Sequence, residues 1–372
     1  MSGASDLIER APGLVELVSG LALDRASSFS RQLDLLDRAL TERGYAVRVI
    51  SAREQRGLGG VPLSIAARIL LGYPDQFFSF DADEAPENRY GRNGRTFLWC
   101  QLSRPPRSPE LGFFQRLELV ALTPRTRDYL VSALGSSRPI SVIPHGVDTE
   151  LFRPGSSAPM RNELGVPEGF VVGAVGANTS RKRFDRVFES FARFRRMLGD
   201  GDAPAFLVVK TDRIIGLDGR DLRLIASRLG IAERTILIEG DWDADRMAEL
   251  FRLFDLFVNV SEWEGFGIPV VEAMASGVPV VTHQVQGPAE ILPYHDFVSS
   301  AGASSTEEGV LLVDADAADV ARLLTAAYRN PELRSVRARE GRAAALAQYD
   351  MRRVAARWID LIEQDAPTLS PP

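Results

Sequence analysis

The sequence predicts an α/β protein of two domains, each built on a parallel sheet flanked by helices. Short apolar segments typical of buried strands alternate with amphipathic segments of helical periodicity along most of the chain. The chain has 372 residues, more than one ordinary hydrophobic core accommodates, so two domains are expected. Its 45% hydrophobic and 25% charged residues are the balance of a soluble globular protein.

Composition narrows the function classes. A formal net charge of −6 gives no electrostatic basis for binding nucleic acid or an anionic membrane. The single cysteine, Cys100, excludes an internal disulfide and fits a reducing compartment. No stretch approaches the roughly 18 consecutive apolar residues of a membrane span, and the N-terminus does not resemble a signal peptide. We therefore expect a cytoplasmic protein.

The first domain, residues 1–147, is predicted to be a Rossmann-like α/β layer. Its clearest helix spans 28–43, because apolar residues recur there at helical spacing and Gly44 follows. The strand candidates of this domain are Leu14–Ser19, Ala46–Ser51, Ala67–Leu71, Thr96–Leu102, Leu117–Leu122 and Ile140–Ile143.

A Pro- and Gly-rich stretch without strong periodicity, residues 144–169, leads into the second domain, residues 148–372. We interpret its first part, 144–154, as the hinge between the domains. Strands are predicted at 170–175, 205–212, 234–242, 256–260 and 278–281, and helices at 184–194, 221–230, 243–254, 269–276, 316–328, 331–349 and 352–363.

Residues 255–281 are the segment around which the second domain is organised. A buried strand at Leu256–Val260 ends in a polar loop, and Pro269 suits the first position of the next helix. A second buried strand follows at Val278–Val281. This short crossover requires parallel strands, so the loop should lie at the carboxyl edge of the sheet, where open α/β sheets bind ligands.

This loop and its helix offer two kinds of ligand contact. Gly265 and Gly267 let the backbone approach an anion, and the free N–H groups of the helix start favour a phosphate. Glu264 in the loop and Glu272, expected in the first helical turn, repel phosphate but accept hydrogen bonds from vicinal hydroxyls. A nucleotide sugar, with a diphosphate between two polyhydroxylated rings, satisfies both sets of groups.

A second loop, after the predicted strand at 170–175, carries Asn178, Arg181 and Lys182. Lysine is informative here because the chain has 42 arginines and two lysines, Lys182 and Lys210. A compact ammonium at a strand's carboxyl end suits a diphosphate. The alternative explanation is an exposed charge in front of a helix.

Three segments in order resemble the family 4-type retaining glycosyltransferases of the glycosyltransferase-B fold. They are VIPHGVDTELFRP at 142–154, VGAVGANTSRKRFDRVFESFARF at 172–194, and EGFGIPVVEAMASGVPVV at 264–281 followed by Gly287 and Glu290. The resemblance covers residues 141 to about 292 well and the first 140 loosely. It implies two facing Rossmann-like domains, the second holding the donor, with a last helix at about 352–363 that crosses back onto the first.

The resemblance also implies roles for individual residues. Glu264 matches the residue that contacts the transferred sugar, Glu272 the one that contacts the ribose, and Lys182 the one that contacts the diphosphate. Arg181 is expected to supply a second cation, which makes Glu264, Lys182 and Arg181 the catalytic group. The predicted donor-binding residues are Glu272, Gly265, Phe266, Gly267, Ile268, Asn178, Gly240, Asp241, Gly287 and Glu290.

The expected reaction transfers a hexose from a nucleotide diphosphate sugar to an acceptor hydroxyl, with retention at the anomeric carbon. Lys182, Arg181 and the helix start at Gly267 would stabilise the departing diphosphate. No aspartate-rich metal motif stands out, so we expect no metal site and no cofactor besides the donor as co-substrate. The acceptor class, a saccharide, a lipid-linked molecule or a small molecule, is not fixed by the sequence.

Two departures from the family pattern bear on the mechanism. The glycine doublet between the first strand and first helix is missing, since the loop reads SGLALDRASS. The family's first-domain histidine has no counterpart either, and Gln101 or Ser103 is the candidate for its contact. The three histidines of the chain are His145, His283 and His295, and we interpret His145 as hinge packing.

Alternatives remain open in three places. The protein could be a non-catalytic nucleotide-sugar-binding or scaffolding member of the fold, or a glycosidase, which also needs two carboxylates but no cations for a diphosphate. Residues 75–95 either border the acceptor cleft or form a solvated loop. Residues 53–71 have some amphipathic character that suits a membrane surface, but three arginines and no lysines favour a strand with its helix.

Overall fold

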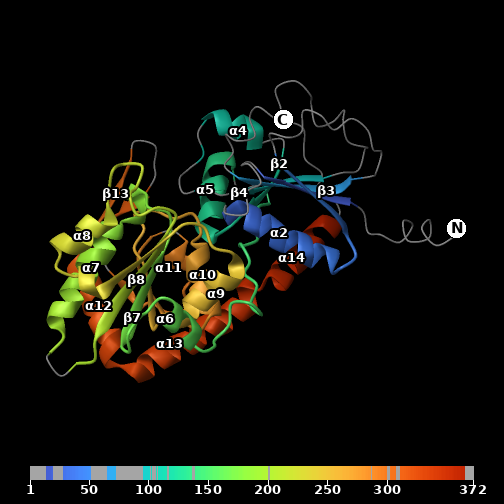
Figure 1. Ribbon diagram of the computed structural model, residues 1–372. Coiled ribbons are helices and arrows are strands. Elements are labelled where there is room, and N and C mark those ends of the chain that lie inside the picture. The colour runs from blue at the N-terminus through green and yellow to red at the C-terminus, as the bar shows by residue number, and fades with distance from the viewer. Residues whose placement is uncertain are drawn as a thin grey trace. The chain divides into compact units, whose positions relative to one another are not determined.

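Figure 1 shows a computed structural model of the chain, which divides into two compact units. The first unit comprises residues 1–146 and 351–372, and the second comprises 147–350. This division lies one residue before the predicted domain boundary and gives the last helix to the first unit. The structure describes residues 14–19, 28–51, 65–72, 95–100, 102, 106, 108–114, 117–135, 139–199, 202–285, 287–299, 302–306 and 311–364.

The first unit contains a six-stranded parallel sheet of order β2-β1-β3-β4-β5-β6, which confirms the predicted α/β class. Every predicted strand of this unit is present, two of them with the predicted limits. The strands are β1 (Leu14–Ser19), β2 (Ala46–Ser51), β3 (Ile65–Gly72), β4 (Arg95–Cys100), β5 (Glu118–Ala121) and β6 (Ser141–Val142), and the described helices are α2 (Ser28–Thr41), α4 (Ser108–Phe114), α5 (Pro124–Leu134) and α14 (Met351–Glu363).

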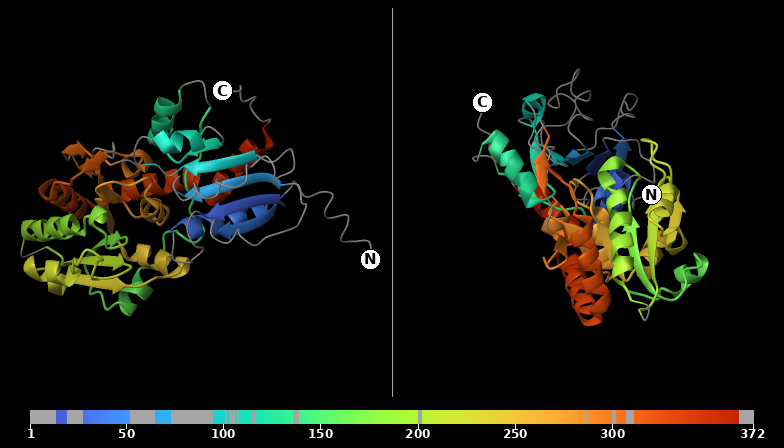
Figure 2. Two further views of the ribbon diagram at one scale, coloured as in Figure 1. Left: turned by 90° about the horizontal axis from the view of Figure 1, so that it is seen from above. Right: turned by 90° about the vertical axis from the view of Figure 1, so that its left-hand side faces the viewer.

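Helices cover both faces of this sheet, with α2 and α14 side by side on one face and α4 and α5 on the other (Figures 1 and 2). Alternation along β4 explains both layers. Leu98 and Cys100 point into a core shared with Phe114 of α4 and Leu130 of α5. Phe97 and its odd-numbered neighbours on β4 point the opposite way.

The face opposite α4 and α5 contains an aromatic cluster that holds the last helix. The fully buried Trp358 of α14 meets Phe97 and Trp99 edge-on, with ring centroids 5.7 and 5.3 Å apart. Trp99 donates its indole N–H to the carbonyl of Ile143 at 2.7 Å and also contacts the ring of His145. Burial lowers the pKa of His145 to about 3, so this ring is neutral and packs in the core of the first unit.

The second unit contains another six-stranded parallel sheet, of order β12-β11-β10-β7-β8-β9, and a hairpin of β13 and β14 that the sequence did not predict. Its strands are β7 (Phe170–Val175), β8 (Ala205–Thr211), β9 (Thr235–Glu239), β10 (Leu256–Asn259), β11 (Val280–His283), β12 (Val298–Ser299), β13 (Ala303–Ser305) and β14 (Leu311–Val313). Its α-helices are α6 (Ala158–Glu163), α7 (Phe184–Met197), α8 (Leu222–Arg228), α9 (Ala244–Leu253), α10 (Ile268–Ala275), α11 (Pro288–Ile291), α12 (Ala317–Arg329) and α13 (Pro331–Ala344).

Among the limits in the second unit that differ from prediction, two have clear local reasons. Strand β11 begins two residues late because Pro279 has no N–H for the ladder, although its carbonyl accepts the N–H of Phe257 at 2.9 Å. The predicted helix 331–349 ends as α-helix at Ala344 and continues as a π-helical turn, Ala345–Tyr349. Within the described ranges, no helix is both long enough and apolar enough to cross a membrane.

Candidate functional site

The two loops singled out in the sequence follow neighbouring strands of the second sheet. Strands β7 and β10 are paired, yet α7 and α10, which follow them, lie on opposite faces of the sheet (Figure 1). From β7 the strand order runs outward through β8 and β9, and from β10 it runs the opposite way through β11 and β12. Such a switch point opens a crevice outside the carboxyl ends of the strands, where doubly wound sheets bind ligands.

The cations of the first loop bind the carboxylate of the second. Lys182 Nζ lies 2.5 Å and Arg181 Nη1 3.0 Å from the same oxygen, Oε2 of Glu264. The side chains of Lys182 and Glu264 are only 9% and 10% exposed, so this contact is shielded from water. All three residues predicted as the catalytic group are thus in direct contact.

Electrostatics keep Glu264 ionised. Burial raises the pKa of its carboxyl, but Lys182 and Arg181 outweigh this effect and lower the pKa to about 2. Burial lowers the pKa of Lys182, and the adjacent carboxylate opposes that shift. Glu264 is thus an anion that balances both cations.

Further contacts fix Arg181 against the second loop. The N–H of Glu262 donates to the carbonyl of Arg181 at 2.7 Å, and Arg181 Nη1 donates to the carbonyl of Trp263 at 3.3 Å. The guanidinium also lies over the Trp263 ring, 4.8 Å from its centroid. Trp263 was not predicted, although an aromatic residue beside a loop carboxylate was a usable signal.

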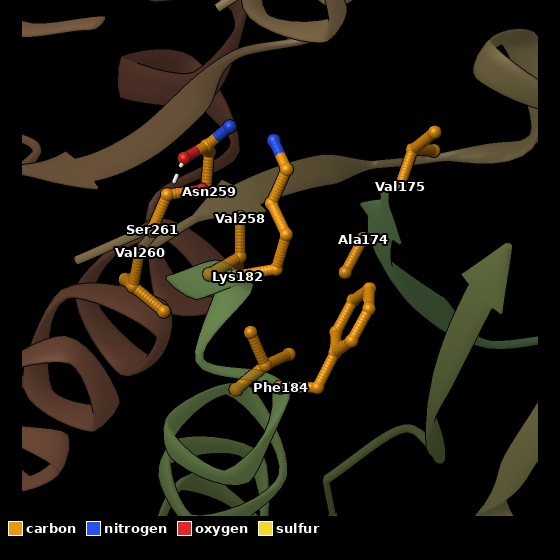
Figure 3. A pocket seen from close by; sticks show the side chains of 9 residues that line it. Ala174, Val175, Lys182, Phe184, Val258, Asn259, Val260 and Ser261 are labelled. Atoms are coloured by element: carbon orange, nitrogen blue, oxygen red, sulfur yellow. Dashed lines mark hydrogen bonds between the residues drawn. The ribbon is translucent and has the colours of Figure 1, made fainter. Parts of the chain in front are cut away.

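The stem of Lys182 passes close to the backbone at the end of β7. A Cβ on Gly176 would lie 3.2 Å from Cδ and Cε of Lys182, so the glycine leaves room for the stem. Beneath it is a cavity of about 10 Å³, whose wall includes Phe184, Val258 and Asn259 (Figure 3). A volume of this size holds roughly one water molecule, so a nucleotide must bind outside it. Asn259, a polar residue within an apolar strand, was not predicted.

The start of α10 differs from prediction in two respects. The N-cap is Gly267, with φ of 98°, so Pro269 occupies the second helical position rather than the first. Glu272 consequently lies in the second turn, where it is 6% exposed. Pro269 lacks an N–H, and the N–H of Val270 bonds to the carbonyl of Gly267 at 2.9 Å. Among the described residues, this leaves the N–H groups of Gly267 and Ile268 as the donors at this helix start.

The other predicted residues near the start of α10 pack on the buried side of the loop that precedes it. Phe266 is 2% exposed and packs against Tyr349, so its ring belongs to the core of the second unit. Gly287 approaches this backbone closely, since a Cβ there would lie 2.5 Å from the carbonyl oxygen of Phe266. Gly265 is buried, whereas Glu290 is exposed and accepts the N–H of Gly287 at 3.3 Å.

Asn178 has a structural role on the other side of the site. Its Nδ2 donates to the carbonyls of Ile214 and Arg220 at 2.9 and 3.1 Å, and its backbone N–H donates to Asp212 at 2.8 Å. Asn178 therefore supports the β8–α8 loop. Because its side-chain nitrogen already donates to two carbonyls, its predicted contact with the nucleotide sugar is less favoured.

Gly240 and Asp241 follow β9, on the outer side of the same sheet edge. Gly240 adopts a φ of 97°, and its carbonyl accepts Nζ of Lys210 at 2.5 Å. Asp241 is exposed. The second lysine of the chain thus anchors the turn predicted to meet the nucleotide base.

Several predictions fall outside the described residues. They are the replacement of the family histidine by Gln101 or Ser103, the loop at 20–27, the acceptor-side loop up to residue 94, and the amphipathic segment before β3. In the described ranges no three His, Cys, Asp or Glu residues are grouped so that they could hold a metal ion.

Sequence comparison identifies a family and relatives of this chain. A family model described as "Glycosyl transferases group 1" matches residues 158–344. The D-inositol 3-phosphate glycosyltransferase of Nocardia farcinica is 33% identical over 189 residues, 49% of this chain and 42% of that protein. The lipopolysaccharide core biosynthesis mannosyltransferase LpsB of Rhizobium meliloti is 30% identical over 203 residues, 53% of this chain and 51% of that protein. The chain thus spans about half the length of these curated relatives, or less.

Solved structures share the fold over nearly the whole chain. Sucrose-phosphate synthase of Thermosynechococcus elongatus has a TM-score of 0.72 at 15% identity, covering 94% of this chain and 98% of its own. HepE of Anabaena, in complex with UDP and glucose, has a TM-score of 0.69 at 17% identity, covering 94% and 99%. These likenesses confirm the glycosyltransferase-B fold that the sequence resemblance implied. The family match covers half of the chain and contains both loops of the site, so the chain belongs to the glycosyl transferases group 1 family.

Proposed function

We propose that this protein transfers a hexose from a nucleotide diphosphate sugar to an acceptor hydroxyl with retention at the anomeric carbon. The observation that carries the proposal is the contact of Lys182 and Arg181 with Glu264 at the switch point of the second sheet. Two cations suit a diphosphate, and a carboxylate suits sugar hydroxyls. The complexes of HepE with UDP-glucose support a donor of this kind.

The ion pair suggests how the donor is received. A diphosphate carries more negative charge than one carboxylate, so it competes with Glu264 for Lys182 and Arg181. Displaced from the cations, the Glu264 carboxylate is released to accept hydrogen bonds from hydroxyls of the transferred sugar. Arrival of the diphosphate thereby prepares the sugar contact.

The same groups support the departure of the diphosphate. Negative charge grows on it as the bond to the sugar breaks, and Lys182, Arg181 and the N–H groups of Gly267 and Ile268 stabilise that charge. We assign this role to protein groups and not to a metal ion, and no cofactor besides the donor enters the proposal. Transfer rates should therefore be the same with and without a chelator such as EDTA.

A second candidate is a non-catalytic protein that binds the donor without transferring its sugar. The surroundings of two of the three histidines favour it. His145 is buried against Trp99 in the core of the first unit, and His283 is fully buried with its Nε2 2.6 Å from the carbonyl of Ser261. Neither ring is placed to serve a substrate as the family's first-domain histidine does.

Thermal melting with a panel of nucleotide diphosphate sugars tests donor binding. A donor at a hundred times its dissociation constant should stabilise the protein by about 2.7 kcal/mol, which raises the melting temperature measurably. A flat panel would count against the donor site. Binding accompanied by release of free nucleoside diphosphate supports transfer, with water or a supplied acceptor as the second substrate. Binding with no release, across saccharide, inositol phosphate and lipid-linked acceptors, would favour the non-catalytic candidate.

A further inference from the structure

Arg183 connects the cationic pair to helix α7, and its backbone is strained. With φ of 48° and ψ of 43°, it is the only described residue other than glycine that has a positive φ. A side chain on Cβ disfavours this left-handed conformation. Such strain persists where surrounding contacts hold it in place, and it concentrates at functional sites.

The guanidinium of Arg183 makes contacts that can hold this conformation. It donates to Asp185 through Nε at 3.2 Å and Nη2 at 3.1 Å. Its Nη1 lies 2.6 Å from Oδ1 of Asp314 and 3.7 Å from Oε1 of Glu262. The Arg183 side chain is only 13% exposed, whereas Asp314 is 48% exposed, so several contacts together, and not one buried pair, hold the guanidinium.

These partners come from the segments that frame the site. Glu262 belongs to the loop after β10, and Asp314 directly follows β14. The backbone of Glu262 joins both neighbours, since its N–H donates to Arg181 and its carbonyl accepts the N–H of Val313 at 2.9 Å. The Arg183 side chain, which directly follows Arg181 and Lys182, therefore links three segments: its own loop after β7, the loop after β10 and the end of β14. We call this contact region the junction.

We propose that Arg183 is a positioning residue for the diphosphate site. Its left-handed backbone turns Arg181 and Lys182 toward the loop after β10. Its ion pairs with Glu262 and Asp314 hold that turn. This inference rests on the proposed function, because the cations that Arg183 positions are those assigned to the donor diphosphate.

Two substitutions separate the side chain from the backbone. Arg183→Ala removes the guanidinium and keeps a strained residue, whereas Arg183→Gly removes the guanidinium and the strain together. Arg193→Ala is the matched control, because it removes a half-exposed arginine of α7, the helix that follows Arg183, paired with Glu189 one turn away. Asp314→Asn is a fourth variant, which keeps the Arg183 side chain but weakens its ion pair with Asp314, together with the pair between Asp314 and Arg186.

The measurement is titration calorimetry of the full chain with UDP and UMP, and with GDP and GMP in parallel, alongside thermal melting. Loss of the junction should weaken the nucleoside diphosphate about tenfold in Arg183→Ala and Arg183→Gly, and in the same direction in Asp314→Asn. The monophosphate, which lacks the second phosphate, should be weakened less. Arg183→Gly should melt above Arg183→Ala, and Arg193→Ala should bind like the wild type.

Three outcomes would overturn the inference. Lower melting temperatures with unchanged diphosphate affinity would give Arg183 a merely structural role. Equal losses for diphosphate and monophosphate would separate Arg183 from the cations. A wild-type protein that binds none of the four nucleotides would remove the proposed function and this inference together. A wild type that binds diphosphates but transfers no sugar would contradict the transferase activity alone, and the positioning role would stand on the variants.

Discussion

At the residue scale, the contact of Glu264 with Lys182 and Arg181 changes the effect on nucleotide affinity that we expect from removing the Glu264 carboxylate. Placed against the sugar alone, Glu264 would leave binding of a bare nucleoside diphosphate almost unaffected. In the structure it occupies Lys182 and Arg181. Glu264→Gln removes this competitor, so the bare diphosphate should bind about tenfold more tightly. The intact donor should gain less, because the sugar loses its charged acceptor.

Titration calorimetry with the nucleoside diphosphate and its sugar conjugate checks this expectation. Glu163→Gln is a suitable control, since Glu163 is half-exposed and pairs with Arg246, away from the site. If the variant weakened the bare diphosphate, Glu264 would be helping the cations to bind it rather than competing. Equal effects on the affinities of both ligands would show that Glu264 does not contact the sugar.

The pKa of Glu264 gives a second expectation at the residue scale. Its folded-state value of about 2 lies below the ordinary 4.5. Ionised Glu264 therefore stabilises the fold above about pH 4.5, and this contribution is lost as the pH falls from 4.5 toward 2. Glu264→Gln should be less stable than the wild type at pH 7, by a few kcal/mol at most, on the order of 3. Urea denaturation at pH 7 and pH 3.5 should show that difference shrinking at the lower pH.

At the element scale, the close approach of Gly277 to Pro154 determines the position of α10, the helix that carries Glu272. Gly277 has a φ of 73°, and a Cβ there would lie 2.8 Å from Cγ of Pro154. Gly230, at the end of α8, has a nearly equal φ of 69°, but nothing lies within 4 Å of its Cβ position. Gly230→Ala should therefore cost about 1 kcal/mol for backbone strain alone, and Gly277→Ala about 2 kcal/mol or more.

Urea denaturation of both variants measures these costs, with the slope compared to detect changes in the unfolded state. Only the substitution at Gly277 should also weaken nucleotide binding, since it displaces α10. Equal losses of stability would mean that the contact with Pro154 relaxes without cost. Tighter or unchanged binding in Gly277→Ala would show that α10 keeps its place.

At the scale of the whole molecule, the chain passes between the two units twice, after Gly146 and after Asp350. Gly146 lies in the predicted hinge, 144–154, and contacts within the first unit hold its backbone in place. Gln32 donates to its carbonyl at 2.8 Å and accepts its N–H at 2.9 Å, while a Cβ on Gly146 would lie 2.7 Å from Cε of Met351. Proline at this position would break a buried hydrogen bond, so it would test stability rather than motion.

A better probe of closure is Gln32→Ala, which removes both hydrogen bonds to Gly146 without placing a ring against Met351 and lies outside the donor site of the second unit. Thermal melting of this variant is measured alongside its turnover, so that a loss of stability is seen separately. We expect the donor to lower the radius of gyration of the wild type in small-angle scattering, because domain-closing enzymes expel water when substrate binds. The variant should lose turnover, roughly two- to tenfold, and keep its affinity for the nucleoside diphosphate. Gln348→Ala, at an exposed position in the π-helical turn, is the matched control. A constant radius of gyration with a fully active variant would contradict the hinge.

The sequence by itself determined the elements and the edge of the sheet at which the site lies. Strand and helix patterns are local, so β1, β2 and β7 have the predicted limits, and parallel alternation places Lys182 and Glu264 at the same carboxyl edge. Local signals did not reach every turn. The hairpin of β13 and β14 is short and polar, and the N-terminal boundary of α10 depends on the φ of Gly267.

Only the tertiary structure decided which side chains meet. Trp358 gives the last helix to the first unit through Trp99, which lies far from it in sequence, and no periodicity specifies that partner. Glu264 acts as the counter-ion of both cations, because burial makes unpaired charge costly and the carboxylate lies within reach. Arg183 adopts a left-handed conformation that its own Cβ disfavours, and acids from two other segments contact its guanidinium. Contacts between distant segments depend on how the chain packs, so a sequence pattern within one segment cannot predict them.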